Sequence, residues 1–196
     1  KKSKMNVAHH YDLSDDLYDL FLDSKRQYSC GYFKNENDTL ETAQNNKIQY
    51  IIKKLNIQPD QKVLDIGCGW GVVLAYLEKQ GVDCCGVDID KNTKHYIDVV
   101  NKLNKTNVGA LHMDYKELPD KVFEKVNLII GCDICYWENH VPNMISLIKK
   151  AKCPVLISDP GRDTFWELTE KVKGNLHEIV LKKPRAVRGY VFEILP

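Results

Sequence analysis

From Lys62 onward, short apolar runs alternate with stretches of helical length, and this alternation constrains the fold more than any other feature of the sequence. Strands that alternate with helices predict βαβ units, and therefore a parallel sheet covered by helices on both faces. The expected strands span residues 63–66, 84–87, 108–111, 126–130 and 155–157, and the expected helices span residues 72–80, 93–103, 141–151 and 164–173.

Both ends of the chain differ from this alternating core. Residues 178–181 and 190–195 form two strand-like runs without a helix between them, which predicts a terminal hairpin at the sheet edge and one antiparallel strand. Near the start, the spacing of apolar residues predicts a helix over residues 13–21 and a second helix over residues 39–55. We therefore expect a helical N-terminal extension or lid at residues 1–58 and a core domain at residues 59–196.

Composition and charge narrow the class of protein. The chain has 196 residues, which suits one domain, or a core with an extension. Lys and Arg number 28 against 27 Asp and Glu, so the formal charge of +1 gives no reason to expect nucleic acid as a partner. No apolar run is long enough to span a bilayer, and the seven irregularly spaced cysteines fit reduced thiols in the cytoplasm. Cys132 and Cys135 have the spacing of zinc ligands but no second pair nearby, so no metal site is expected.

A glycine-rich turn joins the first core strand to the first core helix, in the sequence Asp65-Ile66-Gly67-Cys68-Gly69-Trp70-Gly71. Glycines let the backbone approach a ligand closely, and the helix N-terminus offers free N–H donors. The third glycine comes one residue too early for the dinucleotide pattern. Asp65 would repel a pyrophosphate but suits an ammonium or sulfonium group, and Asp88 follows the second strand, where an acid can accept both hydroxyls of a ribose. The turn and the two acids predict a site for a cationic nucleoside.

Together these features resemble the class I S-adenosylmethionine-dependent methyltransferases, and the resemblance extends from Lys62 to the C-terminus. It implies a Rossmann-like, doubly wound α/β fold with a seven-stranded sheet, mostly parallel and with an antiparallel last strand. It also implies S-adenosyl-L-methionine as the cofactor. The core residues implied to bind it are Asp65, Gly67, Cys68 and Gly69 at the methionine end, Asp88 and its neighbour Ile89 at the ribose, Met113 and Asp114 beside the adenine, and Cys132. The alternative is a glycine turn that only connects a strand to a helix.

The N-terminal third of the chain resembles one branch of these enzymes. Three motifs followed by the glycine turn are similar to cyclopropane fatty acid synthases and their N-methyltransferase relatives: His10-Tyr11-Asp12-Leu13-Ser14, Tyr28-Ser29-Cys30-Gly31-Tyr32-Phe33 and Leu40-Glu41-Thr42-Ala43-Gln44. The resemblance implies that Tyr28 and Ser29 touch the cofactor, and that Cys30 helps to hold a bicarbonate that acts as a base. The same aromatic-rich segment also fits a lid that packs on the core.

Beyond residue 80 a different likeness replaces the first. Glu138 and His140 are not adjacent, so the Glu-His pair of the synthases is not reproduced. The segment Asp133-Ile134-Cys135-Tyr136 instead resembles the Asp-x-x-Tyr element of the seven-strand protein lysine methyltransferases. That resemblance implies Asp133 as a polar anchor for an amine, with Tyr136 and Trp137 as pocket walls. Two alternatives stay open. In the first, Asp133 caps the following helix while Tyr136 and Trp137 pack in a loop. In the second, Arg162, which follows the fifth expected strand, is only a surface charge.

These features predict a methyltransferase that acts on an amine nitrogen, in a protein lysine or a small amine, with Asp133, Tyr136 and Cys30 as the candidate catalytic residues. An amine must be neutral when it attacks, so we expect Asp133 or a water chain to position it and to receive its proton. A second hypothesis is transfer to an unsaturated lipid, for which Cys30 would be required. A third is a binding module that keeps the cofactor site but does not catalyse.

Overall fold

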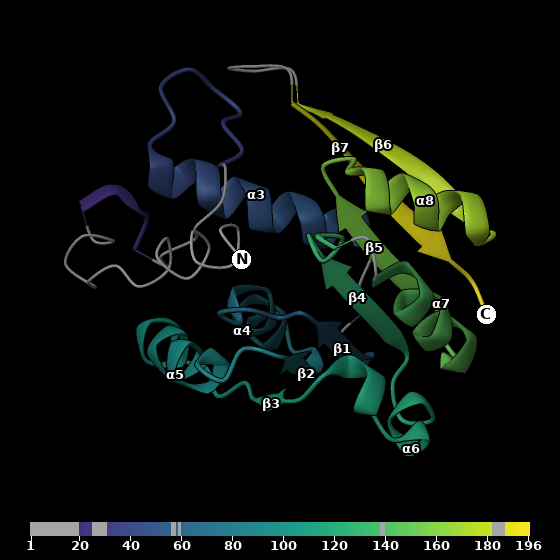
Figure 1. Ribbon diagram of the computed structural model, residues 1–196. Coiled ribbons are helices and arrows are strands. Elements are labelled where there is room, and N and C mark those ends of the chain that lie inside the picture. The colour runs from purple at the N-terminus through teal and green to yellow at the C-terminus, as the bar shows by residue number, and fades with distance from the viewer. Residues whose placement is uncertain (1–19, 25–30, 56–57, 59, 138–139, 182–186) are drawn as a thin grey trace, which may run out of the picture.

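The computed structural model describes residues 20–24, 31–55, 58, 60–137, 140–181 and 187–196, with a seven-stranded sheet at its centre (Figure 1). The strands are β1 (Lys62–Ile66), β2 (Asp83–Asp88), β3 (Ala110–His112), β4 (Leu128–Cys132), β5 (Val155–Asp159), β6 (Asn175–Leu181) and β7 (Val187–Ile194). The helices are α3 (Leu40–Leu55), α4 (Val72–Lys79), α5 (Thr93–Asn104), α6 (Asp120–Phe123), α7 (Val141–Lys150) and α8 (Asp163–Lys171), with a 3₁₀ turn, η1 (Tyr115–Glu117). The helix expected over residues 13–21 falls mostly outside the described residues.

The strand order β3-β2-β1-β4-β5-β7-β6 brings the ends of β1, β2 and β4 together. The pairs among β1, β2, β3, β4 and β5 are parallel, whereas β7 runs antiparallel to both β5 and β6. The expected mostly parallel sheet with a terminal hairpin is therefore confirmed. The chain winds outward from β1 to β3 and then returns to β4 on the other side of β1, which makes the carboxyl edge of β1 and β4 the topological switch point of the sheet.

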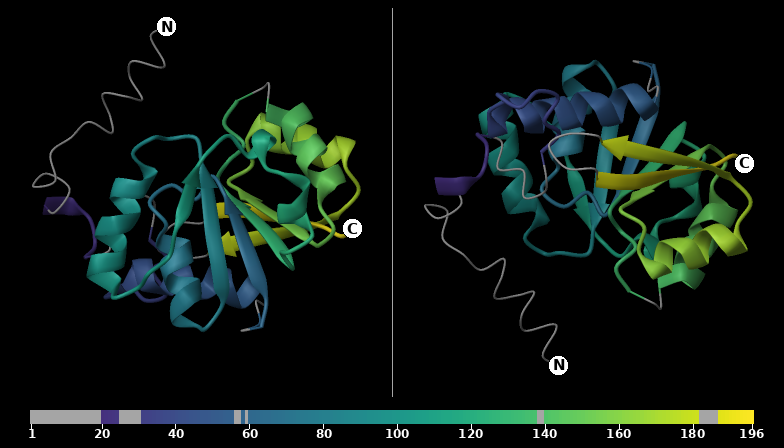
Figure 2. Two further views of the ribbon diagram at one scale, coloured as in Figure 1. Left: turned by 90° about the horizontal axis from the view of Figure 1, so that it is seen from below. Right: turned by 90° about the horizontal axis from the view of Figure 1, so that it is seen from above.

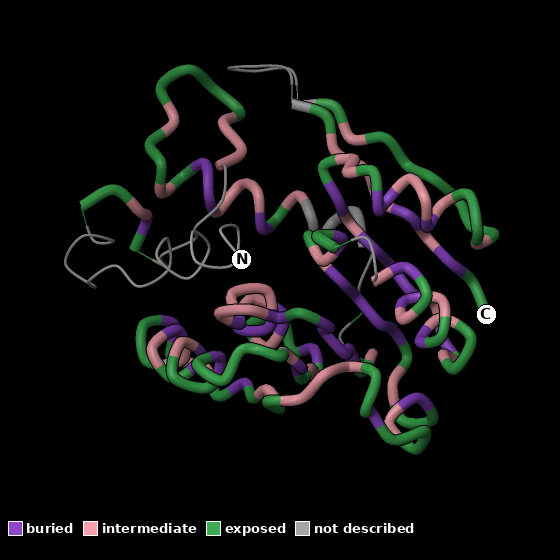
Figure 3. The backbone as a smooth tube through the Cα atoms, in the orientation of Figure 1, coloured by how far each residue is buried: buried purple, intermediate pink, exposed green. Residues whose placement is uncertain are grey.

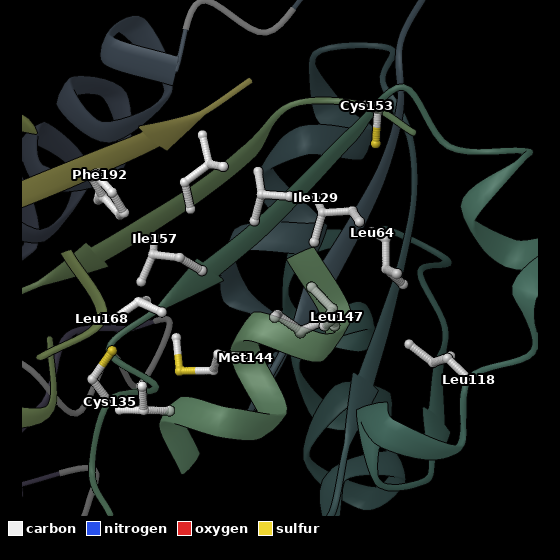
Figure 4. Close-up of a cluster of buried hydrophobic side chains, with 14 of the residues drawn as sticks. Leu64, Leu118, Ile129, Cys135, Met144, Leu147, Cys153, Ile157, Leu168 and Phe192 are labelled. Carbon is white, nitrogen blue, oxygen red and sulfur yellow. The ribbon is translucent and has the colours of Figure 1, made fainter. Parts of the chain in front are cut away.

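Helices cover both faces of the sheet, α3, α4 and α5 on one face and α7 and α8 on the other (Figure 2). Successive side chains of a strand point to opposite faces, so β1 contributes to both layers. Val63 packs with Leu77 of α4, whereas Leu64 packs with Met144 and Leu147 of α7. The buried stretches in Figure 3 follow the central strands, and Figure 4 shows the cluster on the α7 side. Within the described ranges, no helix combines the length and the apolarity needed to cross a bilayer.

Two strands, β3 and β4, begin later than the sequence predicts, and an asparagine side chain makes hydrogen bonds near the start of each. The Nδ2 of Asn101 donates to the carbonyl of Val108 at 2.8 Å, and its Oδ1 accepts from the Val108 N–H at 3.1 Å, so Val108 precedes β3 instead of joining it. At the start of β4, the Oδ1 of Asn127 accepts from the N–H of Lys62 at 2.9 Å. The short elements η1 and α6 were not predicted, since neither is long enough to show a helical period in its apolar residues.

Gly86 lies in β2 against the glycine turn, where a side chain has no room. A Cβ atom at Gly86 would lie 2.4 Å from the Sγ of Cys68 and 2.8 Å from the Cδ1 of Leu74. We expect Gly86→Ala to lower the free energy of unfolding by about 1–3 kcal/mol, the usual cost of overpacking a core, as measured by urea denaturation. Gly109→Ala is the matched control, because a Cβ atom there would meet nothing within 4 Å. Equal losses in both variants would contradict this explanation.

Candidate functional site

The glycine turn between β1 and α4 forms an open backbone loop at the carboxyl edge of the sheet. Gly67, Gly69 and Gly71 have φ angles of 70°, 52° and 72°, in the left-handed region that favours glycine. A Cβ atom at Gly69 would meet nothing within 4 Å, so the loop faces open space at this position. The helix α4 begins directly after Gly71, which leaves its first backbone N–H groups at the same edge.

Asp88 ends β2 and holds the loop in place. Its Oδ2 accepts from the N–H of Gly69 at 2.8 Å, and its Oδ1 accepts from the N–H of Asp90 at 2.8 Å. These two bonds fix the orientation of the carboxylate. Each oxygen of an ionised carboxylate has room for a second donor, so Asp88 can still accept hydrogen bonds from a ligand.

Asp65 is the most unusual residue of the site, because its carboxyl group is buried and incompletely paired. The residue is 2% exposed, and its Oδ1 has no hydrogen-bond partner among the described residues. Burial, together with the nearby charge of Asp88, raises the pKa of Asp65 from 3.8 to about 8. A cationic group placed against Asp65 would stabilise its charged form. The unpaired oxygen and the open space over Gly69 therefore fit a ligand that carries a sulfonium or ammonium group.

A cavity of about 710 Å³ lies at this edge of the sheet. Its lining comes from the ends of β1, β2 and β4 and from the segments that follow β2, β3 and β4. The residues that line it are Gly67, Gly69, Val87, Asp88, Ile89, Met113, Asp114, Tyr115, Lys116, Cys132, Asp133, Ile134, Tyr136, Trp137 and His140. The volume is in the range typical of pockets that bind one small ligand.

The structure brings together most of the residues that the sequence singled out. Ten of them line the cavity: Gly67, Gly69, Asp88, Ile89, Met113, Asp114, Cys132, Asp133, Tyr136 and Trp137. Asp65 and Cys68 do not; Asp65 is buried in β1, and the side chain of Cys68 points to Gly86 of β2. Tyr28, Ser29 and Cys30 lie outside the described residues, so their roles stay predictions.

The lining of the cavity also contains residues to which the sequence analysis assigned no role. Tyr115, Lys116 and His140 line it, although the sequence analysis assigned Tyr115 and Lys116 no role. The only signal in the sequence for Tyr115 and Lys116 was their position directly after Asp114. In the structure, the carboxylate of Asp114 accepts from the N–H of Lys116 at 3.0 Å and pairs with the Nζ of Lys116 at 2.9 Å. Partial burial lowers the pKa of His140. Among the described residues, no group of three or more His, Cys, Asp or Glu side chains is placed to hold a metal ion.

One part of the cavity lining, here called the Asp133 end, is built around Asp133, which follows β4 directly. Its N–H donates to the carbonyl of Ser158 at 2.8 Å, and its carboxylate pairs with the guanidinium of Arg162. The hydroxyl of Tyr136 donates to the other carboxylate oxygen at 3.2 Å, and the Cζ of Arg162 lies 4.4 Å from the centroid of the Tyr136 ring. Asp133 therefore does not cap α7, where His140 takes the capping position. Arg162, which the sequence left open as a surface charge, joins this cluster.

The sheet order, the antiparallel β7 and the glycine turn between two acids define the fold of the class I S-adenosylmethionine-dependent methyltransferases. Within this class, the chain belongs to the mycolic acid cyclopropane synthetase family, whose family model matches residues 1–140. The match continues past the N-terminal third of the chain and ends just before α7.

Individual relatives show the same likeness. Cyclopropane mycolic acid synthase 1 of Mycobacterium tuberculosis is 37% identical over 126 residues, which are 63% of this chain and 44% of that protein. Cyclopropane mycolic acid synthase 3 of the same organism is 44% identical over 93 residues, which are 47% of this chain and 32% of that protein. This chain thus spans less than half the length of the curated relatives it matches.

Solved structures extend the comparison to the fold. A mycolic acid cyclopropane synthase in complex with SAH and CTAB matches with a TM-score of 0.62 and 31% identity, over 79% of this chain and 55% of that chain. Coclaurine N-methyltransferase, bound to N-methylheliamine and SAH, matches with a TM-score of 0.68 over 85% of this chain and 60% of that chain. Its sequence identity is 17%, so this second likeness supports the fold alone.

The buried Asp65 makes the stability of the free protein depend on pH. Its pKa of about 8 in the folded state lies above the value of about 3.9 for an unfolded chain, so between these values the folded protein binds more protons. The contribution of Asp65 to the free energy of unfolding is therefore greatest below about pH 4 and is lost as the pH rises to about 8.

We expect Asp65→Asn to remove this contribution to the pH dependence. Urea denaturation of the wild type and the variant at several pH values from 5 to 8 isolates the contribution of Asp65. Subtracting the free energies of unfolding of the two proteins cancels the effect of the other titrating groups. The stability of the wild type relative to the variant should fall as the pH rises. A difference that stays constant over this range would contradict the burial of an ionisable group at Asp65.

Proposed function

We propose that the chain is a methyltransferase that uses S-adenosyl-L-methionine as its methyl donor. The observation that carries this proposal is the buried carboxyl of Asp65, with an unpaired oxygen, at the edge of the sheet where the cavity opens. The donor has a sulfonium and an ammonium group, and a positive charge near a buried carboxyl favours its ionised form. The related mycolic acid cyclopropane synthase structure contains SAH, which supports the same class of ligand here.

The residues of this chain would bind and orient the donor. Asp88 would accept from ribose hydroxyls with the lone pairs that its two backbone partners leave free. Met113 and Asp114 would lie beside the adenine, and Gly67 and Cys132 beside the methionine end. When bound, the donor supplies an electrophilic methyl group for in-line displacement from sulfur. The protein then needs to align the acceptor and to exclude water, and a covalent intermediate is unnecessary.

We further propose that the acceptor is an amine nitrogen, because of the side chains at the Asp133 end of the cavity. The carboxylate of Asp133 can accept a hydrogen bond from an amine, and the rings of Tyr136 and Trp137, each more than half exposed, can lie against its positive charge. Asp133 would orient the amine and receive its proton, either directly or through water. A cavity of about 710 Å³ that also holds the donor suits a small amine or a lysine side chain better than a long acyl chain.

Transfer to an unsaturated lipid is the second candidate, and family membership favours it. The family model matches residues 1–140, and the similar proteins include cyclopropane mycolic acid synthases. The cavity lining also includes the apolar side chains of Val87, Ile89 and Ile134. In this case Cys30 would help to hold a bicarbonate base, as the resemblance of the N-terminal segment implies.

The two candidates can be separated by following the labelled methyl group. The protein is incubated with methyl-labelled S-adenosylmethionine and, in parallel, with lysine-containing peptides, a panel of small primary and secondary amines, or vesicles of an unsaturated phospholipid. Label in the peptide or small-amine fraction supports the amine proposal, and label in the phospholipid supports the second candidate. Label in none of the fractions, together with measurable donor binding, would contradict both.

Asp88→Asn should weaken donor binding without unfolding the protein. Hydrogen bonds to a charged acceptor contribute about 1.5–3 kcal/mol, so we expect the Kd for S-adenosylmethionine to rise by about 10- to 100-fold in titration calorimetry. Asp98→Asn is the matched control, since Asp98 lies on the exposed surface of α5 and pairs with Lys94 at 2.7 Å. An unchanged Kd in Asp88→Asn would contradict the proposed position of the ribose.

Asp133→Asn and Cys30→Ala should affect the two candidate reactions in opposite ways. For an amine acceptor, loss of the Asp133 carboxylate should lower kcat/KM by about 100-fold or more, the usual range for a proton-transfer group, while Cys30→Ala retains activity. For a lipid acceptor, Cys30→Ala should abolish turnover. Steady-state kinetics with each acceptor, at saturating donor, measures this difference, and an Asp133→Asn variant with full amine activity would contradict the proposed role.

A further inference from the structure

Arg162 lies where the carboxyl ends of β4 and β5 meet, at the start of α8. Its Nη1 donates to Oδ1 of Asp133 and, at 2.7 Å, to Oδ2 of Asp159. Its guanidinium also lies over the ring of Tyr136, with 4.4 Å between Cζ and the ring centroid. Arg162 thus contacts two of the three described residues that were proposed to face the acceptor, Asp133 and Tyr136, although it does not itself line the cavity.

The other side of Arg162 is anchored to a buried carboxylate. The side chain of Asp159 is fully buried, and its Oδ1 accepts from the N–H groups of Gly161 and Arg162, both at 2.8 Å. The Nε1 of Trp166 donates to the carbonyl of Gly161 at 3.0 Å, and a Cβ atom at Gly161 would lie 2.8 Å from Tyr190. If Asp159 turned away, two partly buried N–H donors would lose their partner, so these hydrogen bonds hold the turn in place.

Asp133 itself is in a backbone conformation that needs such support. Its φ angle is 61°, in the left-handed region that residues other than glycine rarely adopt. Its carboxylate is half exposed, and an exposed carboxylate without partners would sample several rotamers. The ion pair with Arg162 and the hydrogen bond from Tyr136 restrict it to one orientation.

We infer that Arg162 is a positioning residue for the acceptor half of the site, an inference that rests on the proposed function. It connects the turn after β5 to the Asp133 carboxylate through an ion pair and to the Tyr136 ring through stacking. Loss of Arg162 should therefore affect catalysis only through its effect on Asp133 and Tyr136. Lysine can replace the charge but not the planar group that lies over a ring, so it should restore only part of the function.

The test combines kinetics with a double-variant cycle, using the amine that the wild type methylates fastest. We expect Arg162→Gln to lower kcat/KM for that amine about tenfold or more while the Kd for S-adenosylmethionine is unchanged, and Arg162→Lys to recover part of the loss. In the Asp133→Asn background, Arg162→Gln should cause little further loss, because the two residues act as one unit. Arg188→Gln is the matched control, since Arg188 pairs with Glu178 at 3.3 Å on the exposed hairpin of β6 and β7.

A second measurement does not depend on turnover. Hydrogen exchange of the backbone amides of residues 133–137 should be faster in Arg162→Gln than in the wild type or in Arg188→Gln. Unchanged exchange, an unchanged kcat/KM in Arg162→Gln, or additive losses in the double variant would each overturn the inference. If exchange increases as expected but the wild type methylates no amine, the proposed function fails and the positioning role of Arg162 stands.

Discussion

The contact between the side chain of Cys68 and the bare backbone of Gly86 underlies the geometry of the whole site. Because Gly86 has no side chain, the glycine turn can fold down onto β2, and the N–H groups of Gly67 and Cys68 reach the carbonyl of Val87 at 2.8 and 3.3 Å. Asp88 then accepts from the N–H of Gly69. These contacts join the turn to the end of β2 and fix the position of the turn relative to Asp88.

Two carboxyl groups near the site, those of Asp159 and Asp65, are both buried but differ in how completely they are hydrogen-bonded. Asp159 is fully buried and accepts hydrogen bonds from two backbone N–H groups and from Arg162, so its charge is compensated within the protein. Asp65 is equally buried but keeps an oxygen without a partner among the described residues, and its pKa is raised. A buried carboxyl without compensation destabilises the free protein and can be stabilised by a cationic ligand. Asp159 thus supports structure, whereas the unpaired oxygen of Asp65 is the group that the proposed function assigns to a cationic donor.

The two halves of the site differ in their relation to the family. The glycine turn, Asp88 and Asp133 lie within residues 1–140, which the family model matches. Asp159 and Arg162, which hold the Asp133 end of the cavity, come after that match. The part of the site that would hold the donor therefore belongs to the segment shared with the family. The support for the acceptor end comes from β5 and α8, which lie beyond the residues that the family model matches.

The sequence by itself determined the order and type of the main elements, because alternating apolar runs and helical periods are local properties of the chain. It also placed Asp65, Gly67 and Asp88 at strand ends, and strand ends of a parallel sheet meet at one edge. Only the tertiary structure decided that Arg162 would pair with Asp133, 29 residues earlier, since β4 and β5 become neighbours through long-range pairing that no local period encodes. The burial of Asp65 was decided in the same way, because it depends on which strands and loops pack around β1.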